Sequence, residues 1–591
     1  MRARSPSRAL LAWLSATALV PLLGCSSGVR RFPLREPLTR DTDLRSVYVP
    51  CRPAPSKDDP RHVECTPEPY VSPLAWDMAD NTVFRPLAQV FAVSPGGEAV
   101  NVNALDEVPD SSWFENRIGQ RPMTPDEIFR GPCSVLLDEK EWPDGSWRID
   151  EGKPNGATPG FRVRVPEYGK FMLKADPKEQ PERASAASAI GMRLYHAVGF
   201  HVPCDAVVYF PERFLKLTPG LVATDNTGIP RAFDDKALRS VLVTNSRRGD
   251  RMRMQSSQWV SGRVLGPFKY EGTRSDDPND VIPHQDRREL RGARLLAAWV
   301  NHFDAREQNT MTTWIADDRS RPDSSPGHVR HYYLDVSEVF GSEWDWDGIS
   351  RRLGHSYYLD FAHVSQDFIT LGLLSRPWDR AVKGPSGEVF GYFRGEDFVP
   401  EDWHDGYPNP SFDRMTEHDG AWMARILARI TPPLLEAAVK AGNFSQPRHE
   451  RYLIDTLLER RRRILHRYLA RLSPLTQPRV SGRRVCVSDR ARESQAFEGA
   501  SFRYDAHLYR GERLEDGGVL RISPDPGGSP CFDLPEGPVD RSPDDSAARY
   551  RIVDMTNGQA RWPLRMHFYD LGAGGLRLVG LERPESAGAP E

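Results

Sequence analysis

One short segment of the chain, residues 301–309, contains side chains that can carry protons and bind metal ions. It reads Asn-His-Phe-Asp-Ala-Arg-Glu-Gln-Asn and so brings His302, Asp304 and Asn309 close together in sequence. Imidazole and carboxylate groups are common proton carriers in enzymes, and carboxylate and amide oxygens are ligands of hard divalent cations. Farther along, an apolar run ends at Asp335, a carboxylate that could equally cap a turn.

A lysine and a glutamate upstream offer a second set of charges. Lys174 ends a run of strand-like alternation, and Glu182 stands in the first turn of a helical segment that Pro181 opens. A lysine at a strand end usually lies along the surface, and a glutamate at a helix start usually complements the helix dipole. Both residues follow a loop of spaced glycines centred on Gly156. Their importance depends on the elements that carry them.

The elements that must position these residues follow from the periodicity of the sequence. Alternating apolar and polar residues predict a strand before the glycine loop, a second strand at 161–165 after it and, beyond a turn, a third strand at 170–174. Apolar residues at helical spacing predict helices over 181–198, 286–302, 420–430, 433–441 and 448–472. After residue 478 the pattern returns to short strands, with an Asn-Gly turn at 557–558 that is typical of a hairpin.

The order of these features resembles the protein-kinase-like superfamily, particularly divergent branches such as the HipA-type toxin kinases and the secretory-pathway kinases related to the Golgi casein kinase. The H-x-D-x-x-x-x-N spacing of residues 302–309 is that of the kinase catalytic loop. In that loop the Asp accepts the proton of the substrate hydroxyl, and the Asn binds a metal ion. The resemblance spans roughly residues 146–475. It implies a two-lobed fold and a reaction that uses ATP with Mg²⁺ or Mn²⁺.

The same resemblance implies catalytic and metal-binding roles. His302 and Asp304 would be the catalytic residues, with Asp304 as the base. Asn309 and Asp335 would bind the metal ion. The alternative is a protein that keeps the kinase fold without catalysis and serves as a scaffold or binding lipoprotein. A hydrolase has little support, because no H-E-x-x-H motif occurs.

The nucleotide would be held by the upstream residues. Lys174 would hold the phosphates, Glu182 would form an ion pair with it, and Gly156 would lie in the nucleotide-binding loop. The glycines do not form G-x-G-x-x-G, and Asp335 is followed by Val336 and Ser337 instead of Phe-Gly. These departures point away from ordinary Ser/Thr/Tyr kinases and leave the acceptor substrate open.

The composition limits the classes of partner. The chain has 591 residues, with 79 Lys and Arg against 82 Asp and Glu and a formal net charge of −3. A chain so balanced has no general attraction for a phosphate backbone, so we expect no nucleic-acid partner. Beyond the N-terminus no stretch approaches the roughly 20 consecutive apolar residues of a transmembrane helix. The partners that we expect are the membrane and an unidentified protein or glycan.

The N-terminus carries an export signal. Arginines at positions 2, 4 and 8 precede an apolar stretch at 9–24, and Leu-Leu-Gly-Cys at 22–25 resembles the lipobox of bacterial lipoproteins. The resemblance implies cleavage before Cys25, a lipid anchor of the diacylglyceryl and palmitate type on that residue, and a place in the bacterial cell envelope at the outer membrane. A plain secretory peptide that ends in a cysteine is the alternative.

The remaining cysteines suit an oxidising compartment. They are Cys51, Cys65, Cys133, Cys204, Cys486 and Cys531. An even number in an exported protein favours disulfides. We predict one bridge between the first two, which flank a Pro-rich segment, and one between the last two, which lie in the strand-rich C-terminal region. The middle two are far apart in sequence, and their pairing stays open.

We therefore expect an α+β protein in which a kinase-like domain, with a small β-rich lobe and a larger helical lobe, precedes an all-β domain. The expected parts are a signal peptide at 1–24, a tether at 25–75, an N-terminal extension at 76–145, an N-lobe at 146–235, a C-lobe at 236–475 and a β-sandwich-like domain at 478–591.

Two charged segments are typical of solvated surface. One is the run Arg460–Arg463, for which an anionic partner or lipid headgroup is the alternative. The other is the acidic loop 276–280 before His284, for which a cation site is the alternative.

Overall fold

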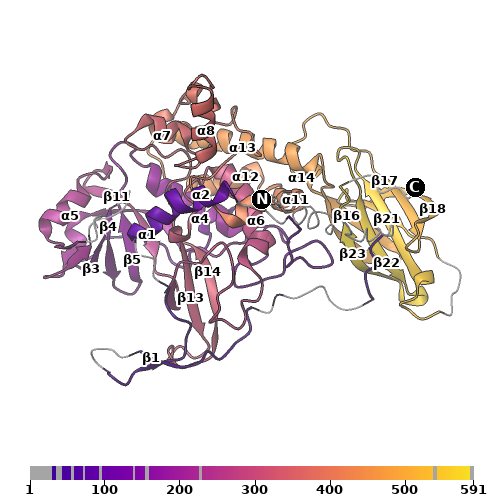
Figure 1. Cartoon of the computed structure of the whole chain (residues 1–591), viewed down its shortest axis with the longest axis horizontal. Coiled ribbons are helices and arrows are strands. Elements are labelled where there is room, and N and C mark those ends of the chain that lie inside the picture. The colour runs from indigo at the N-terminus through magenta and orange to yellow at the C-terminus, as the bar shows by residue number, and fades with distance from the viewer. Residues whose placement is uncertain are drawn as a thin grey trace, which may run out of the picture.

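The computed structural model describes residues 29–34, 41, 43–54, 59–70, 74–91, 96–137, 140–153, 159–224, 229–536 and 542–585. It is a mixed structure of helices and strands, and Figure 1 shows its parts. A sheet with flanking helices lies at one end, a helical body lies in the middle, and the C-terminal strands lie at the other end. A narrow sheet and the β1/β2 pair project from the helical body (Figure 1).

The first sheet contains the strands predicted around the glycine loop, and it also includes strands up to residue 258, beyond the expected N-lobe limit of 235. Its strands lie in the order β10-β11-β5-β4-β3-β7, and β6 also pairs with β11. The strands are β3 (Trp147–Lys153), β4 (Gly160–Val165), β5 (Gly169–Lys174), β6 (Asp205–Pro211), β7 (Leu215–Leu217), β10 (Arg247–Arg248) and β11 (Arg251–Gln258). Alternate residues such as Phe161, Val163 and Leu173 are fully buried in one core with Leu242 of α5 (Asp235–Leu242). This one-sided burial produces the alternation seen in the sequence.

Helix α4 (Arg183–Val198) joins this sheet to the helical body. It is rich in Ala and Ser and is buried on nearly every side, as expected of a helix enclosed between layers. Ile190 and Leu194 belong to the core of the helical body, while the helix also contacts β6 and β11. It ends at Gly199, whose φ of 142° favours glycine.

Four helices form the centre of the helical body, and each overlaps a helix predicted from the sequence. They are α6 (Arg288–Val300), α11 (Glu417–Leu427), α12 (Pro432–Lys440) and α13 (Pro447–Leu469). Their apolar faces share one core that includes the buried residues Leu295, Trp422 and Leu465. Helix α6 ends at Asn301, whose left-handed φ of 58° turns the chain into the 301–309 segment.

A three-stranded sheet fixes both ends of the candidate site. Strands β12 (Arg263–Gly266), β13 (Thr310–Ala316) and β14 (Gly327–Tyr333) pair antiparallel in that order. Asn309 lies directly before β13, and Asp335 lies just after β14. Because Thr310 pairs with Tyr333, these two flanking residues lie side by side.

Shorter helices and strand pairs complete the structure. The helices are α1 (Leu74–Ala79), a π-helical turn (Asp80–Phe84), α2 (Arg85–Gln89), α3 (Pro125–Arg130), α7 (Asp347–Arg352), α8 (Phe361–Ile369), α9 (Gly387–Phe390) and α10 (Pro410–Asp413). Two small strand pairs are β1 (Arg52–Pro53) with β2 (Val63–Glu64), and β8 (Val222–Thr224) with β9 (Pro230–Ala232). Among the described residues, no helix combines the length and apolar character needed to cross a membrane.

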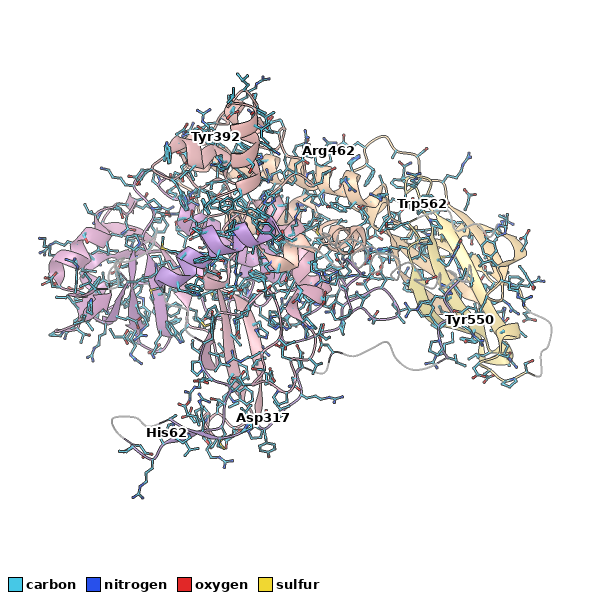
Figure 2. All side chains as sticks on the ribbon, viewed as in Figure 1. His62, Asp317, Tyr392, Arg462, Tyr550 and Trp562 are labelled. Carbon is cyan, nitrogen blue, oxygen red and sulfur yellow. A yellow bond between two sulfur atoms is a disulfide. The ribbon has the colours of Figure 1, made fainter. Side chains whose placement is uncertain are left out.

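The C-terminal strands form two further sheets, ordered β15-β16-β20-β19 and β18-β17-β21-β22-β23. Their strands are β15 (Leu475–Ser481), β16 (Arg484–Asp489), β17 (Asp505–Arg510), β18 (Glu515–Leu520), β19 (Ile522–Pro524), β20 (Pro530–Asp533), β21 (Tyr550–Thr556), β22 (Leu564–Asp570) and β23 (Leu576–Glu582). A short helix, α14 (Arg490–Glu493), follows β16. β21 and β22 pair as the predicted hairpin, and the Asn-Gly pair begins the connection 557–563 between them. Phe32 packs beside Tyr550 of β21, in the five-stranded sheet, and Figure 2 labels Tyr550.

Three disulfides are present in the described residues. Cys51–Cys65 and Cys486–Cys531 confirm the two predicted bridges. Cys133 and Cys204, whose pairing the sequence leaves open, also form a bridge. Cys133 follows α3 and Cys204 precedes β6, and both of these elements pack against α4. The shared helix brings two cysteines together that are distant in sequence.

The two segments predicted as solvated surface are each partly buried. Arg460 and Arg461 are only 6% and 3% exposed, and they donate hydrogen bonds to carbonyl oxygens at the ends of α6 and α11, respectively. Only part of the run faces solvent, as Arg462 does in Figure 2. His284 is 3% exposed, and its Nε2 lies 2.7 Å from Asp280 Oδ2. In both segments, the buried charged and polar groups have hydrogen-bond partners, which makes their burial stable.

Candidate functional site

Lys174 and Asp335 form an ion pair between the first sheet and the loop after β14. Lys174 Nζ donates a hydrogen bond to Asp335 Oδ2 at 2.6 Å. Lys174 is 8% exposed, and an ammonium group so enclosed needs a partner for its charge. Burial opposes the charged form of Lys174, but the Asp335 carboxylate outweighs burial, so the pKa of Lys174 is raised. Although burial acts in the other direction, Lys174 holds the pKa of Asp335 well below its usual range.

Main-chain hydrogen bonds tie Asp335 to the 301–309 segment. The N–H groups of Leu334 and Asp335 donate to the carbonyl oxygen of Asn309 at 2.8 and 3.2 Å. Asp335 Oδ1 accepts the N–H of Ser337 at 2.9 Å, so the residue also caps a turn, which is the ordinary role that its position suggested. The two carboxylate oxygens therefore have different partners: Oδ1 holds the loop through Ser337, and Oδ2 bonds Lys174.

Asp304 and Asn309 are locked to each other. Asn309 Nδ2 donates to both the main-chain oxygen and Oδ2 of Asp304, each at 2.7 Å, and Arg306 Nε lies 3.2 Å from Asp304 Oδ1. Burial raises the pKa of Asp304 to about 7, with the charges of Glu338 and Asp335 acting in the same direction and Arg306 opposing them. A carboxylate with a pKa near neutrality is well matched to proton acceptance.

His302 lies in the core behind the site. It is 1% exposed, and its Nδ1 lies 2.7 Å from the hydroxyl of Tyr195 on α4. Burial lowers the pKa of His302 to about 4, although the charge of Asp335 opposes this, so the ring is neutral at pH 7. We interpret His302 as a residue that positions the segment against α4, because its ring is enclosed.

The expected ion pair between Lys174 and Glu182 does not form. Glu182 is the residue before α4 and has a left-handed φ of 70°. Its Oε2 accepts hydrogen bonds from the main-chain N–H and the hydroxyl of Ser445, at 3.0 and 3.1 Å. The left-handed turn at Glu182 directs the carboxylate to Ser445, and the charge of Lys174 is already balanced by Asp335.

Other charged groups, which the sequence patterns did not single out, border the site. Lys153, at the end of β3, is half-buried, and burial together with the charge of Lys174 lowers its pKa to about 8 while Asp335 opposes the change. Glu338 acts on Lys174 and on Asp304. The position of Lys153 directly before the glycine loop is a signal that could have identified it. Gly156 in that loop lies outside the described residues.

The donor groups fit a hard cation that carries a phosphate chain. Asp335 and Asn309 offer carboxylate and amide oxygens, and Mg²⁺ typically takes one or two carboxylates and completes its shell with water and phosphate oxygens. In the described residues, nothing donates a hydrogen bond to Asn309 Oδ1, which is the amide atom that could serve as a ligand. The ammonium groups of Lys174 and Lys153 suit the phosphates. Glu338 adds a further carboxylate near Asp304.

Comparison with known proteins adds no relative. No family model, no curated protein and no solved structure matches this chain.

Proposed function

We propose that this protein is an exported, lipid-anchored phosphotransferase of the protein-kinase-like type that uses ATP with Mg²⁺ or Mn²⁺. In this proposal residues 146–475 form a two-lobed kinase-like domain, and residues 478–591 form a C-terminal β domain. The observation that carries it is the Lys174–Asp335 ion pair at 2.6 Å, between residues 161 positions apart. Lys174 ends an inner strand of the sheet, and Asp335 follows β14; in protein kinases a strand lysine holds the phosphates and a carboxylate at a corresponding place binds the metal ion.

Each residue of the site has a proposed role. Lys174, with Lys153 beside it, binds the phosphates, while Asp335 and Asn309 hold the metal ion. The bound metal would neutralise the charge on the terminal phosphates. The acceptor hydroxyl oxygen bonds to the γ-phosphorus, the bond from that phosphorus to the β–γ bridging oxygen breaks, and ADP leaves. Asp304 takes the hydroxyl proton, which its pKa of about 7 permits at neutral pH.

The proposed anchor is the lipidated Cys25, which lies outside the described residues. Val29 and Phe32 pack against the C-terminal strands, and the main-chain N–H of Phe32 donates to the Tyr550 hydroxyl at 2.9 Å. Only Ser26, Ser27 and Gly28 lie between Cys25 and Val29. A fully extended chain of this length spans about 14 Å at most. A lipid on Cys25 would therefore hold the C-terminal strands close to the outer membrane.

A nucleotide-binding titration tests the proposal. The purified protein should bind ATP only when Mg²⁺ or Mn²⁺ is present, and Lys174→Met and Asp335→Asn should each weaken binding by about tenfold or more. Lys170→Met is the matched control, because Lys170 lies on the same strand but at its other end. Asp304→Asn should leave binding nearly intact and lower phosphate transfer by several orders of magnitude, because the base acts on the acceptor.

Two results would count against the proposal. If no nucleotide binds under any metal condition, the enzyme hypothesis fails. If nucleotide binds but no phosphate reaches any acceptor, the protein is instead a kinase-fold scaffold or binding lipoprotein.

A further inference from the structure

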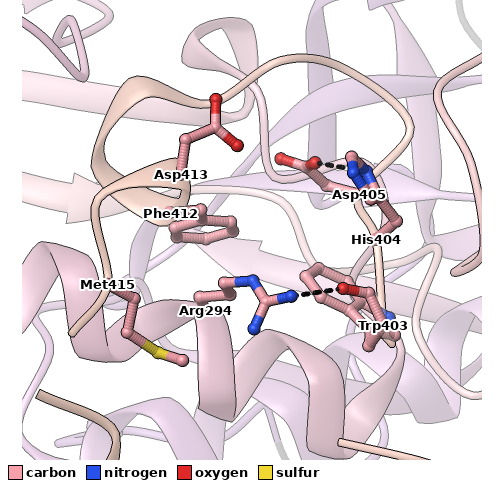
Figure 3. A pocket seen from close by; sticks show the side chains of 7 residues that line it. All are labelled: Arg294, Trp403, His404, Asp405, Phe412, Asp413 and Met415. Carbon is pink, nitrogen blue, oxygen red and sulfur yellow. Dashed lines mark hydrogen bonds and ion pairs between the residues drawn. The ribbon is translucent and has the colours of Figure 1, made fainter. Parts of the chain in front are cut away.

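A polar cavity of about 300 Å³ opens in the helical body (Figure 3). It is lined by Arg294, Trp403, His404, Asp405, Phe412, Asp413 and Met415. Arg294 comes from α6, and the other residues come from the loop before α10, from α10 and from the chain after it. The candidate site contains none of these residues.

Arg294 supplies the positive side of the cavity. Its Nη2 donates to the main-chain oxygens of Glu401 and Trp403, at 3.1 and 2.7 Å. These two bonds hold the guanidinium in place along one edge, and Figure 3 shows the bond to Trp403. Within the described part of the chain, no acceptor takes a hydrogen bond from its Nε or Nη1. A fixed guanidinium with an open edge is a typical partner for a carboxylate.

Asp405 and Asp413 supply the negative side. Asp405 is 4% exposed, and its buried Oδ2 has no hydrogen-bond partner in the described residues. Its Oδ1 lies 3.6 Å from His404 Nδ1. Asp413 stands at the exposed mouth, where Tyr357 and Gln89 donate to its two oxygens. Figure 3 shows the two carboxylates on the same side of the cavity.

The two carboxylates are costly to hold together when the cavity contains only water. Burial raises the pKa of Asp405, while His404 and Arg294 oppose this. An unpaired buried carboxylate oxygen, such as Oδ2 of Asp405, carries a desolvation penalty that a bound cation would remove.

We infer that the cavity binds a small zwitterion of the α-amino acid type, with its carboxylate on Arg294 and its ammonium group on Asp405 and Asp413. A simple anion would be repelled by the two aspartates, and a simple cation would be repelled by Arg294. A molecule with both charges a few ångströms apart satisfies both sides.

The size and the walls of the cavity agree with this ligand class. At about 30 Å³ for each water-sized group, a 300 Å³ space holds on the order of ten non-hydrogen atoms, which is the size of a free amino acid. Trp403, Phe412 and Met415 also line the cavity, so a small part of its mostly polar wall is apolar. A metal ion fits less well, because His404, Asp405 and Asp413 do not bring three ligand atoms within 4.8 Å of one another, as Glu98, His418 and Glu585 do.

Calorimetric titration of the purified full chain with the common free L-amino acids, one at a time, tests the inference. At least one should bind, and Asp405→Asn and Arg294→Gln should each weaken its binding by about tenfold or more. Arg294→Gln also releases two main-chain oxygens, so Arg294→Lys is the second variant; it keeps the charge, loses the fork and should also weaken binding. Asp402→Asn, on the same loop but outside the cavity, is the matched control and should bind like the unmodified protein.

The controls use ligands that carry only one of the two charges. The matching amine, which lacks the carboxylate, and the matching carboxylic acid, which lacks the amine, should both bind much more weakly than the amino acid. The inference is overturned if no amino acid binds at millimolar concentration, if the amine binds as tightly as the amino acid, or if Zn²⁺ or Mg²⁺ alone occupies the cavity and excludes the amino acid. ATP plays no part in this assay, so its outcome is independent of the proposed phosphotransferase.

Discussion

Replacing Asp304 with Asn should change the stability of the protein differently at two pH values. Relative to the unmodified protein, the variant should be more stable at pH 8 than at pH 5. Burial raises the pKa of Asp304 from 3.8 to about 7. Between these values the folded protein holds a proton that the unfolded chain has released, so stability falls as the pH rises and the loss is complete above pH 7. Asparagine does not titrate, and its Oδ1 can still accept the hydrogen bond from Asn309, so the variant lacks this loss.

The magnitude follows from the width of the titration. Each pKa unit corresponds to about 1.4 kcal/mol. Stability falls by this amount per pH unit over the roughly two units between pH 5 and the folded-state pKa of Asp304, which is about 7. The free energy of unfolding of the unmodified protein should therefore fall by about 3 kcal/mol between pH 5 and pH 8, and the variant should not show this fall. The interaction with Arg306 is already included, because it contributes to the pKa itself. In a domain of this size, such a difference corresponds to a shift of several degrees in the thermal midpoint.

Thermal unfolding at the two pH values, without nucleotide, measures this difference. The quantity to compare is the gain in midpoint of the variant at pH 8 minus its gain at pH 5, which should be positive. Asp402→Asn, on an exposed loop, is the control and should give a difference near zero. An equal change at both pH values, or a variant that loses stability at pH 8 relative to pH 5, would refute the electrostatic account of Asp304.

Three further predictions concern the envelope and the core. Intact mass of the membrane fraction should show a diacylglyceryl-modified N-terminus at Cys25, and an unmodified soluble protein cut elsewhere would contradict the lipobox. Replacing Cys486 and Cys531 with serine opens a bridge with a sequence separation of 45 and should cost a few kcal/mol, measured as lower denaturant resistance of the C-terminal strands. Arg460→Met leaves buried carbonyl oxygens without donors and should cost about 2–4 kcal/mol, whereas the exposed Arg462→Met should change the stability by less than about 0.5 kcal/mol.

Local pattern alone determined much of this protein. The strands around the glycine loop, the long helices and the C-terminal hairpin were predictable because each depends on the alternation or helical spacing of neighbouring residues. Cys51–Cys65 was predictable for a similar reason, since its loop is short. The order of Lys174, Asp304 and Asp335 along the chain is also visible in the sequence, and it predicts that the three residues share one site.

Only the tertiary structure decided which of these charges meet. The sequence pattern assigned Glu182 as the partner of Lys174, but Lys174 pairs with Asp335 after β14, while Glu182 accepts hydrogen bonds from Ser445. Arg460 was expected in solvent because its charge is visible in the sequence. The carbonyl oxygens at the end of α6, which accept its hydrogen bonds, are not. The cavity beside Arg294 was hidden for the same reason. Local periodicity specifies elements, whereas the partner of a buried charge depends on groups far away in sequence that only the assembled fold brings into contact.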